Sequence, residues 1–102
     1  MAEFRRVGSI DEVVEGALAR FTVNGARVAV ANVGGAFYAV DDRCTHKRCS
    51  LSKGDLEGTS VICPCHGGQY DLASGVVMAG PPPEPISVYP VRVVDGDLEI
   101  EV

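Results

Sequence analysis

The sequence predicts an all-β fold, an antiparallel barrel or sandwich with a ligand-bearing segment inserted into it. Short runs of branched apolar residues recur along the 102-residue chain, and 12 glycines and 6 prolines supply turns between them. The last run, residues 98–102, alternates apolar with acidic side chains, as a half-buried strand does. All four cysteines and both histidines fall within residues 44–66, which marks the inserted segment.

A chain of this length is expected to form one domain with one core. Hydrophobic residues make up 46% and charged residues 23%, which is typical of a folded globular protein. We expect residues 1–40 and 73–102 to form the base of the fold. Residues 41–72 are expected to form the ligand-bearing subdomain.

The first half of the chain predicts a short helical turn followed by three strands. Ser9 and Glu12 have the spacing of a capping box, which starts a helical turn that ends by Gly16. Residues 18–23 and 27–33 are strand-like runs separated by Asn24-Gly25-Ala26, and an Asn-Gly pair supplies the positive φ angles of a tight hairpin. A third strand, residues 36–40, completes a meander.

The second half predicts further strands and one stiff loop. Residues 60–62 and 76–78 read as strands, with a turn at Ser74-Gly75 between them. In residues 80–85 four of six residues are prolines, which have no amide hydrogen, so this segment is expected to be a loop. Residues 86–94 and 98–102 then form a closing hairpin across Asp95-Gly96.

Charge and hydropathy exclude several classes of protein. The formal net charge is -5 and the isoelectric point is about 4.8, so the basic surface of a nucleic-acid binder is missing as a global property. The longest apolar runs are far shorter than the roughly 20 residues of a membrane span. The first residues do not have the apolar core of a secretory signal. We therefore expect a cytoplasmic protein that binds neither nucleic acid nor membrane.

Two short clusters carry the chemistry. Cys44-Thr45-His46 and Cys63-Pro64-Cys65-His66 each supply one thiolate and one imidazole. A [2Fe-2S] centre in which two histidines replace two cysteines on one iron needs this mixture of ligands on two loops. The alternatives are a chance cluster and a zinc site, but a zinc finger places its cysteines in one arm and its histidines in the other.

On these motifs the sequence resembles the Rieske family over nearly the whole chain. The resemblance implies the small Rieske fold and one [2Fe-2S] cluster, with Cys44 and Cys63 on the inner iron and His46 and His66 on the outer iron. Two neutral imidazoles in place of two thiolates remove negative charge, so the expected reduction potential lies between about −150 and +300 mV. The implied role is one-electron transfer, and not catalysis.

The other two cysteines, Cys49 and Cys65, have counterparts in the Rieske subunits of cytochrome bc and b/f complexes. There, cysteines at matching places form a disulfide that ties the two loops together, and the resemblance implies the same bond here. Because a reducing cytosol disfavours disulfides, the alternative is a pair of free buried thiols.

The same resemblance implies roles for residues around the cluster. The hydroxyl of Tyr70 would donate to the sulfur of Cys44 and raise the potential. The serine that high-potential relatives place after the glycine is Gly68 here, so an intermediate potential is expected. The proline loop would shield the cluster from water; its residues are Gly80, Pro81, Pro82 and Pro83. The alternative for the tyrosine is a residue that only packs in the core, and the alternative for the loop is a plain linker between strands.

The leading functional interpretation is a soluble ferredoxin. It would receive electrons from a flavin reductase and pass them to an oxygenase, such as an aromatic-ring oxygenase, or to another redox protein. Basic residues near the ligands could form a docking patch or a plain solvated surface; they are Arg43, Lys47, Arg48 and Lys53. The rival interpretations are the small subunit of an assimilatory nitrite reductase and a soluble relative of a respiratory Rieske subunit.

Overall fold

Three antiparallel sheets make up the fold in a computed structural model, which describes residues 3–43, 49–65, 68–79 and 85–101. One sheet has the order β1-β11-β10, formed by Phe4–Ser9, Asp97–Glu101 and Val91–Val94. A second has the order β2-β3-β4-β9, formed by Leu18–Val23, Ala26–Val33, Ala36–Asp41 and Val88–Tyr89. The third has the order β5-β6-β7-β8, formed by Asp55–Glu57, Ser60–Ile62, Gln69–Asp71 and Val77–Ala79.

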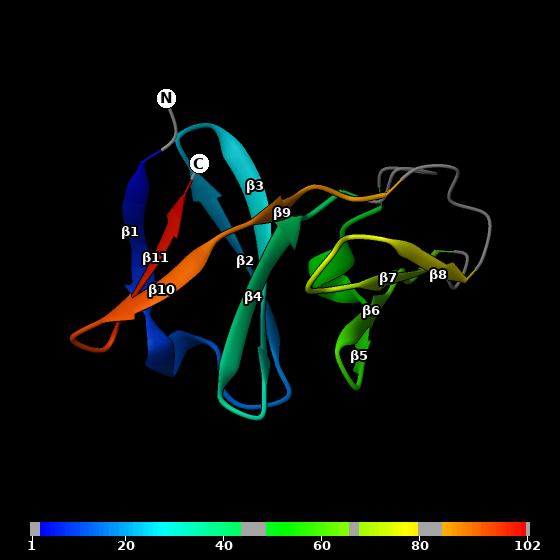
Figure 1. Cartoon of the computed structure of the whole chain (residues 1–102), viewed down its shortest axis with the longest axis horizontal. Helices are drawn as coiled ribbons and strands as arrows, with labels where there is room; N and C mark the ends of the chain where they lie inside the picture. Colours follow the sequence, from blue (N-terminus) through cyan, green and yellow to red (C-terminus); the bar gives the residue numbers. More distant parts are fainter. Residues whose placement is uncertain (1–2, 44–48, 66–67, 80–84, 102) are drawn as a thin grey trace.

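The first two sheets together are called the base, and the third sheet with the neighbouring 3-10 turn η2 (Leu51–Lys53) is called the module. Figure 1 shows the base and the module side by side, and β2 and β3 of the base contact η2 of the module. The predicted all-β, antiparallel fold class is confirmed. Among the residues described, no helix has the length and apolar character needed to cross a membrane.

The central strand β3 explains how the two parts are joined. Successive side chains of a strand point to opposite faces of its sheet. Val28 and Val30 face the core shared with the first sheet, whereas Ala29 and Ala31 belong to the core shared with the module. A strand covered on both faces needs apolar residues at every position, and all four of these residues are fully buried.

Two tight turns confirm the predicted hairpins. Asn24 and Gly25 both have positive φ, 50° and 82°, and they connect β2 directly to β3 because Val23 pairs with Ala26. Asp95 and Gly96, with φ of 50° and 81°, connect β10 to β11 in the same way. Type I′ turns require positive φ at both central residues, which Asn-Gly and Asp-Gly tolerate well.

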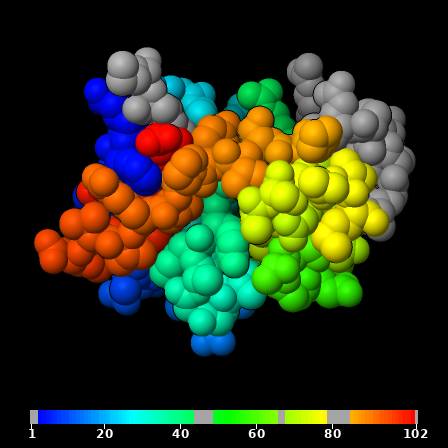
Figure 2. All heavy atoms as spheres, in the orientation of Figure 1, coloured from blue at the N-terminus to red at the C-terminus, as the bar shows by residue number. Residues whose placement is uncertain are grey.

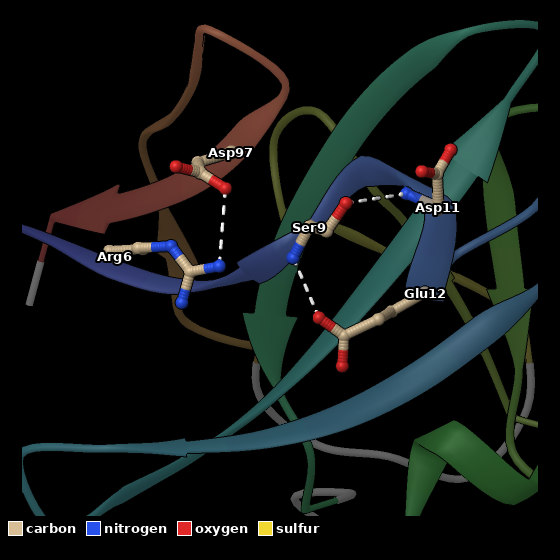
Figure 3. A network of polar contacts seen from close by, with 5 residues as sticks. All are labelled: Arg6, Ser9, Asp11, Glu12 and Asp97. Atoms are coloured by element: carbon tan, nitrogen blue, oxygen red, sulfur yellow. Dashed lines mark hydrogen bonds and ion pairs between the residues drawn. The ribbon is translucent and has the colours of Figure 1, made fainter.

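The N-terminal segment differs from the prediction by forming a strand before its helical turn. The capping box is present: the Glu12 carboxylate accepts from the backbone N–H of Ser9 at 2.6 Å, and Ser9 Oγ accepts from that of Asp11 at 3.3 Å. Figure 3 shows this cap beside an Arg6–Asp97 ion pair of 3.2 Å. The strand β1 that precedes it pairs with β11 at the other end of the chain, so no local pattern announced it.

The closing segment, residues 86–94, was predicted as one strand and is divided at Pro90 into β9 and β10. These two strands lie in different sheets, β9 beside β4 and β10 beside β11. Proline has no amide hydrogen to donate to a sheet, and the chain passes from one sheet to the other there, with the Pro90 carbonyl accepting from the Glu101 N–H at 3.0 Å. Figure 2 shows the segment 85–94 (orange) lying across both the base and the module.

The module also has strands that the sequence did not announce, β5 and β7, each of three residues. Its sheet extends from Asp55 to Ala79, beyond the predicted boundary at residue 72. The division of the chain at residues 40 and 72 stays a prediction, and the name module refers here to the sheet β5-β6-β7-β8 with η2.

Candidate metal centre

The second predicted ligand loop lies between two paired strands of the module. Ile62 at the end of β6 pairs with Gln69 at the start of β7, so the described residues Cys63, Cys65 and Gly68 lie in the connection between these two strands. The backbone N–H of Cys63 donates to the carbonyl of Gly68 at 2.6 Å, which closes the loop at its base. The Cys63 side chain is only 2% exposed and lies in the core shared by base and module.

Cys49 and Cys65 form a disulfide with their Cα atoms 6.4 Å apart. The bond predicted from the family resemblance is thus present, and the alternative of two free buried thiols is wrong for this structure. Cys49 lies three residues after His46, the last residue of the first ligand cluster, and Cys65 lies within the second cluster. The disulfide therefore joins the two segments that carry the predicted ligands.

A third sulfur lies beside this bond. The sulfur atoms of Cys49, Cys63 and Cys65 are all within 4.8 Å of one another. Because Cys49 and Cys65 are bonded to each other, neither is available as a thiolate ligand, whereas Cys63 is outside the bond. A buried cysteine at the point where both ligand-bearing segments meet suits an iron–sulfur cluster, whose irons take cysteine thiolates.

Other predicted site residues lie outside the described part of the chain. The ligand candidates in this group are Cys44, His46 and His66, and the loop residues are Gly80, Pro81, Pro82 and Pro83. Their predicted roles stay predictions. Of the four basic residues near the ligands, Arg43 and Lys53 are described and both are exposed, whereas Lys47 and Arg48 also lie outside the description.

Tyr70 lies on β7 and is completely buried in the same core cluster as Cys63. It pairs with Val61 across the sheet, and both residues belong to the core between module and base. The predicted bond from its hydroxyl to Cys44 involves a residue outside the described part, so this bond stays a prediction. Gly68 is described and buried, at the closing bond of the Cys63 loop.

One polar group beside the first ligand segment was missed by the sequence analysis. Asp42 is only 1% exposed, and its carboxylate accepts hydrogen bonds from Ser50 Oγ at 2.6 Å and from the backbone N–H of Ser52 at 2.8 Å. Two features of the sequence could have revealed this group. An acidic residue directly follows an apolar strand, two positions before a ligand cluster, and two serines follow the cluster.

The turn after β7 holds a second acidic group. Asp71 accepts hydrogen bonds from Ser74 Oγ at 2.7 Å and from the Ser74 backbone N–H at 2.9 Å. These bonds stabilise the carboxylate and hold the pKa of Asp71 below its ordinary value of 3.8. Gly75 follows with a φ of 79°, and a Cβ atom there would meet the carbonyl oxygen of Ile86, so the turn needs glycine.

Comparison with known proteins identifies the family. Residues 3–90 match the Rieske [2Fe-2S] domain. The chain is 37% identical over 102 residues to the anthranilate 1,2-dioxygenase ferredoxin subunit of Burkholderia cepacia, an alignment that covers 100% of this chain and 94% of that one.

Solved structures agree with this match. A ferredoxin of Sphingomonas yanoikuyae B1 superposes with a TM-score of 0.91 at 34% identity, covering 98% of this chain and 99% of that one. A chain in a complex of reduced oxygenase and oxidized ferredoxin in carbazole 1,9a-dioxygenase superposes with a TM-score of 0.89 at 34% identity, covering 96% and 92%. An NADH-dependent nitrite reductase small subunit from Mycobacterium tuberculosis has a TM-score of 0.90 at 19% identity, covering 100% and 96%, which shows the fold alone.

The relatives are named as ferredoxin subunits, which are electron carriers and not catalysts. The prediction of an electron-transfer protein is thereby confirmed. The buried Cys63 beside a loop-joining disulfide, the antiparallel sheets and the match over most of the chain all agree. The chain belongs to the Rieske [2Fe-2S] family and carries electrons on a cluster of that type.

Proposed function

We propose that Cys44, His46, Cys63 and His66 hold the cluster, and that the protein passes single electrons from a flavin reductase to a ring-hydroxylating oxygenase. The observation that carries this proposal is the disulfide between Cys49 and Cys65 with Cys63 beside it. The bond draws together the two segments in which the four ligand candidates lie. When bound, the cluster supplies the site that accepts and releases one electron.

The ligand set rests on elimination as well as on the motifs. The chain has four cysteines and two histidines. Two cysteines are used in the disulfide, which leaves Cys44 and Cys63 to supply thiolates. The two histidines then complete a mixed set, which is the set that a Rieske cluster requires. Every sulfur and imidazole side chain among the cysteines and histidines has a role in this assignment.

The partners are proposed from the relatives. The similar sequences are ferredoxin subunits of anthranilate and biphenyl dioxygenases, at 37% and 38% identity. One structural neighbour comes from a complex of oxygenase and ferredoxin. These relatives favour an oxygenase over a nitrite reductase as the acceptor. A flavin reductase as donor fits a dioxygenase system of this kind. The exposed Arg43 and Lys53 support a docking surface near the first ligand segment.

We also propose a cytoplasmic location, in keeping with the dioxygenase ferredoxin subunits that the chain resembles. The disulfide is unusual for that compartment, because cytosolic thiol systems keep most cysteines reduced. Alkylation of the thiols in intact cells, followed by mass spectrometry, would count the cysteines that are protected. Protected Cys49 and Cys65 in a cytosolic fraction would support the proposal, whereas recovery of the protein only from a secreted fraction would contradict it.

The ligand assignment is tested first on the cluster itself. The purified protein should contain two irons and two sulfides per chain, as a [2Fe-2S] centre does, and its reduced form should give the electron paramagnetic resonance spectrum of a mixed-ligand cluster. Separate alanine substitutions of His46 and His66 should abolish the cluster. Lys53→Ala is the control, because Lys53 is exposed and is not a proposed ligand. One zinc per chain in the wild-type protein would contradict the assignment.

The partners are tested by rapid-mixing kinetics. Reduced protein should be reoxidised by an aromatic-ring dioxygenase oxygenase component with its substrate bound, and the oxidised protein should be reduced by the matching flavin reductase with NADH. A nitrite reductase large subunit serves as the comparison acceptor. Faster transfer to the nitrite reductase than to the oxygenase would overturn the proposed partner.

A further inference from the structure

A buried carboxylate stands at the base of the first ligand segment. Asp42 comes directly after β4, and its side chain is only 1% exposed. Its backbone is held on both sides: its N–H donates to the carbonyl of Arg27 at 3.1 Å, and its carbonyl accepts from the N–H of Leu51 at 2.6 Å. The residue is therefore attached to β3 of the base and to η2 of the module.

The carboxylate connects the two ends of the ligand segment. Oδ2 accepts from Ser50 Oγ at 2.6 Å, and Oδ1 accepts from the Ser52 backbone N–H at 2.8 Å. The two serine hydroxyls are also within hydrogen-bond distance, 3.0 Å apart. A β-bridge between Arg43 and Ser50 joins the same two stretches one residue closer to the ligand cluster. We call Asp42, Ser50 and Ser52 the Asp42 clamp.

Burial of a carboxylate opposes folding unless hydrogen bonds compensate it. The base solves a similar problem with a neutral group: Asn32 donates to the Val13 carbonyl at 2.8 Å and accepts from the Gly35 N–H at 2.9 Å. A neutral amide is the less demanding group to bury. Beside the ligand segment the buried group is a carboxylate, and each of its oxygens accepts one hydrogen bond. This choice indicates that two strong hydrogen bonds are needed at this place.

We propose that Asp42 is a positioning residue that holds together the two stretches on either side of the first ligand cluster, residues 42–43 and 50–52. In the sequence, Cys44 and His46 lie between these stretches, and Cys49 comes next to Ser50. Closing a segment at its base removes conformational freedom before a ligand binds or a disulfide forms, which favours both events. The cluster part of this inference rests on the ligand set proposed above, whereas the disulfide part does not.

The test uses two readouts on the full chain. The first is the rate at which the holoprotein loses its cluster to an iron chelator. The second is the equilibrium between the disulfide and dithiol forms of the apoprotein in glutathione redox buffers, measured by thiol alkylation. Asp42→Ala should accelerate cluster loss and weaken the disulfide by about tenfold each, the size expected for losing hydrogen bonds to a charged group.

Three further variants give the expected order of effects. Ser50→Ala removes the donor to Oδ2 and should change both readouts by a smaller factor, about threefold. Asp42→Asn keeps an acceptor for the Ser52 N–H but loses the charged acceptor that faces Ser50 Oγ, so its effect should lie between those of Ser50→Ala and Asp42→Ala. Ser52→Ala leaves the backbone donor in place and removes only the hydroxyl beside Ser50 Oγ, so it should have the smallest effect of the four variants.

A core variant separates positioning from general loss of stability. Val13→Ala removes buried volume in the base, in the core cluster that does not include the module. If Asp42→Ala is no worse than Val13→Ala when the two are compared at equal distance below their melting temperatures, the proposal is overturned. If Asp42→Ala does not fold, Ser50→Ala decides the question against the same control. Failure of the wild type to bind iron would refute the ligand set and leave the disulfide readout to judge the clamp.

Discussion

The base and the module are stabilised in different ways. The base has strands of up to eight residues and an aliphatic core in which Val28, Val30, Leu98 and Ile100 are completely buried. The module has three-residue strands, and its segments are joined by the disulfide and the Asp42 clamp. Short strands share few hydrogen bonds, so the module depends on covalent and polar connections, and on the base whose sheet it covers.

This difference indicates that the base and the module have separate roles. A base stabilised by packing can hold a constant shape while the module is shaped by the needs of the metal centre. Changes in the base are therefore expected to alter the stability of the whole chain and to leave the electron-transfer site unchanged. Changes in the module are expected to alter the site more than the fold.

The largest expected effect on stability comes from the base core. Leu98 on β11 is completely buried, and Leu98→Ala should lower the free energy of unfolding by about 2–5 kcal/mol, through lost apolar contact and a residual cavity. Urea denaturation of the apoprotein measures this loss. Val93→Ala on the adjacent strand β10 is the control, since Val93 is 48% exposed. Equal losses for the two variants would contradict the picture of a packed base core.

Removal of the disulfide is the next largest change. The double substitution Cys49→Ser with Cys65→Ser opens a link between residues 16 apart in sequence, and a link of this size contributes about 3 kcal/mol in chain-entropy estimates. The melting temperature of the apoprotein should fall. A reductant should lower the melting temperature of the wild type and have no effect on the variant; an equal response of both proteins to reductant would argue against the bond as the cause.

The capping box of the base should have an effect of about 1 kcal/mol. Ser9→Ala removes the hydroxyl that accepts from the Asp11 N–H, as drawn in Figure 3. Ser9→Thr keeps a hydroxyl and should lose little. Chemical denaturation measures both variants, and the reduction potential of the holoprotein should be the same in both. A change in potential would break the proposed separation between base and module.

Tyr70→Phe tests the module, where a change is expected to alter the electron-transfer site more than the fold. The hydroxyl is predicted to donate to a cluster ligand and so to favour the reduced state; its removal should lower the reduction potential by some tens of millivolts, where about 59 mV corresponds to tenfold in a one-electron equilibrium. Voltammetry of the holoprotein measures the shift. Tyr38→Phe is the control, because Tyr38 packs against the same core cluster and has no predicted bond to the cluster. Equal potentials for Tyr70→Phe and the wild type would refute the donor role.

The smallest effect is expected in the turn after β7. Ser74→Ala removes the first of the hydrogen bonds that lower the pKa of Asp71, so this pKa should move up toward 3.8. A lowered pKa in the folded state means that the carboxylate stabilises the fold above its unfolded pKa, and that this contribution is lost as the pH falls through the folded pKa. A titration followed by nuclear magnetic resonance would detect the shift. An unchanged Asp71 pKa in the variant would exclude Ser74 Oγ as its cause.

Local features of the fold could be predicted from neighbouring residues. The turns at Asn24-Gly25 and Asp95-Gly96 and the cap at Ser9 depend on the φ angles and hydrogen bonds of a few adjacent residues. The Cys49–Cys65 disulfide was implied by family resemblance, since pairing of cysteines cannot be deduced from sequence alone. The metal centre was predicted because its ligand types and spacing are rare in combination.

Other features had no local signal. The strand β1 forms because β11, from the other end of the chain, pairs with it. Strands of three residues, such as β5 and β7, are too short to show an alternating pattern. Pro90 was visible in the sequence, but only the change of sheet between β9 and β10 shows what it divides.

The sequence by itself determined the class of the fold, the kind of metal centre and the two tight hairpins, because ligand chemistry and turn geometry are properties of a few neighbouring residues. Only the tertiary structure decided that β3 is buried on both faces and that a carboxylate connects the two ends of the first ligand segment. Both depend on surfaces that residues far apart in the chain create when they pack together. Asp42 is buried only because those residues cover it in the folded chain.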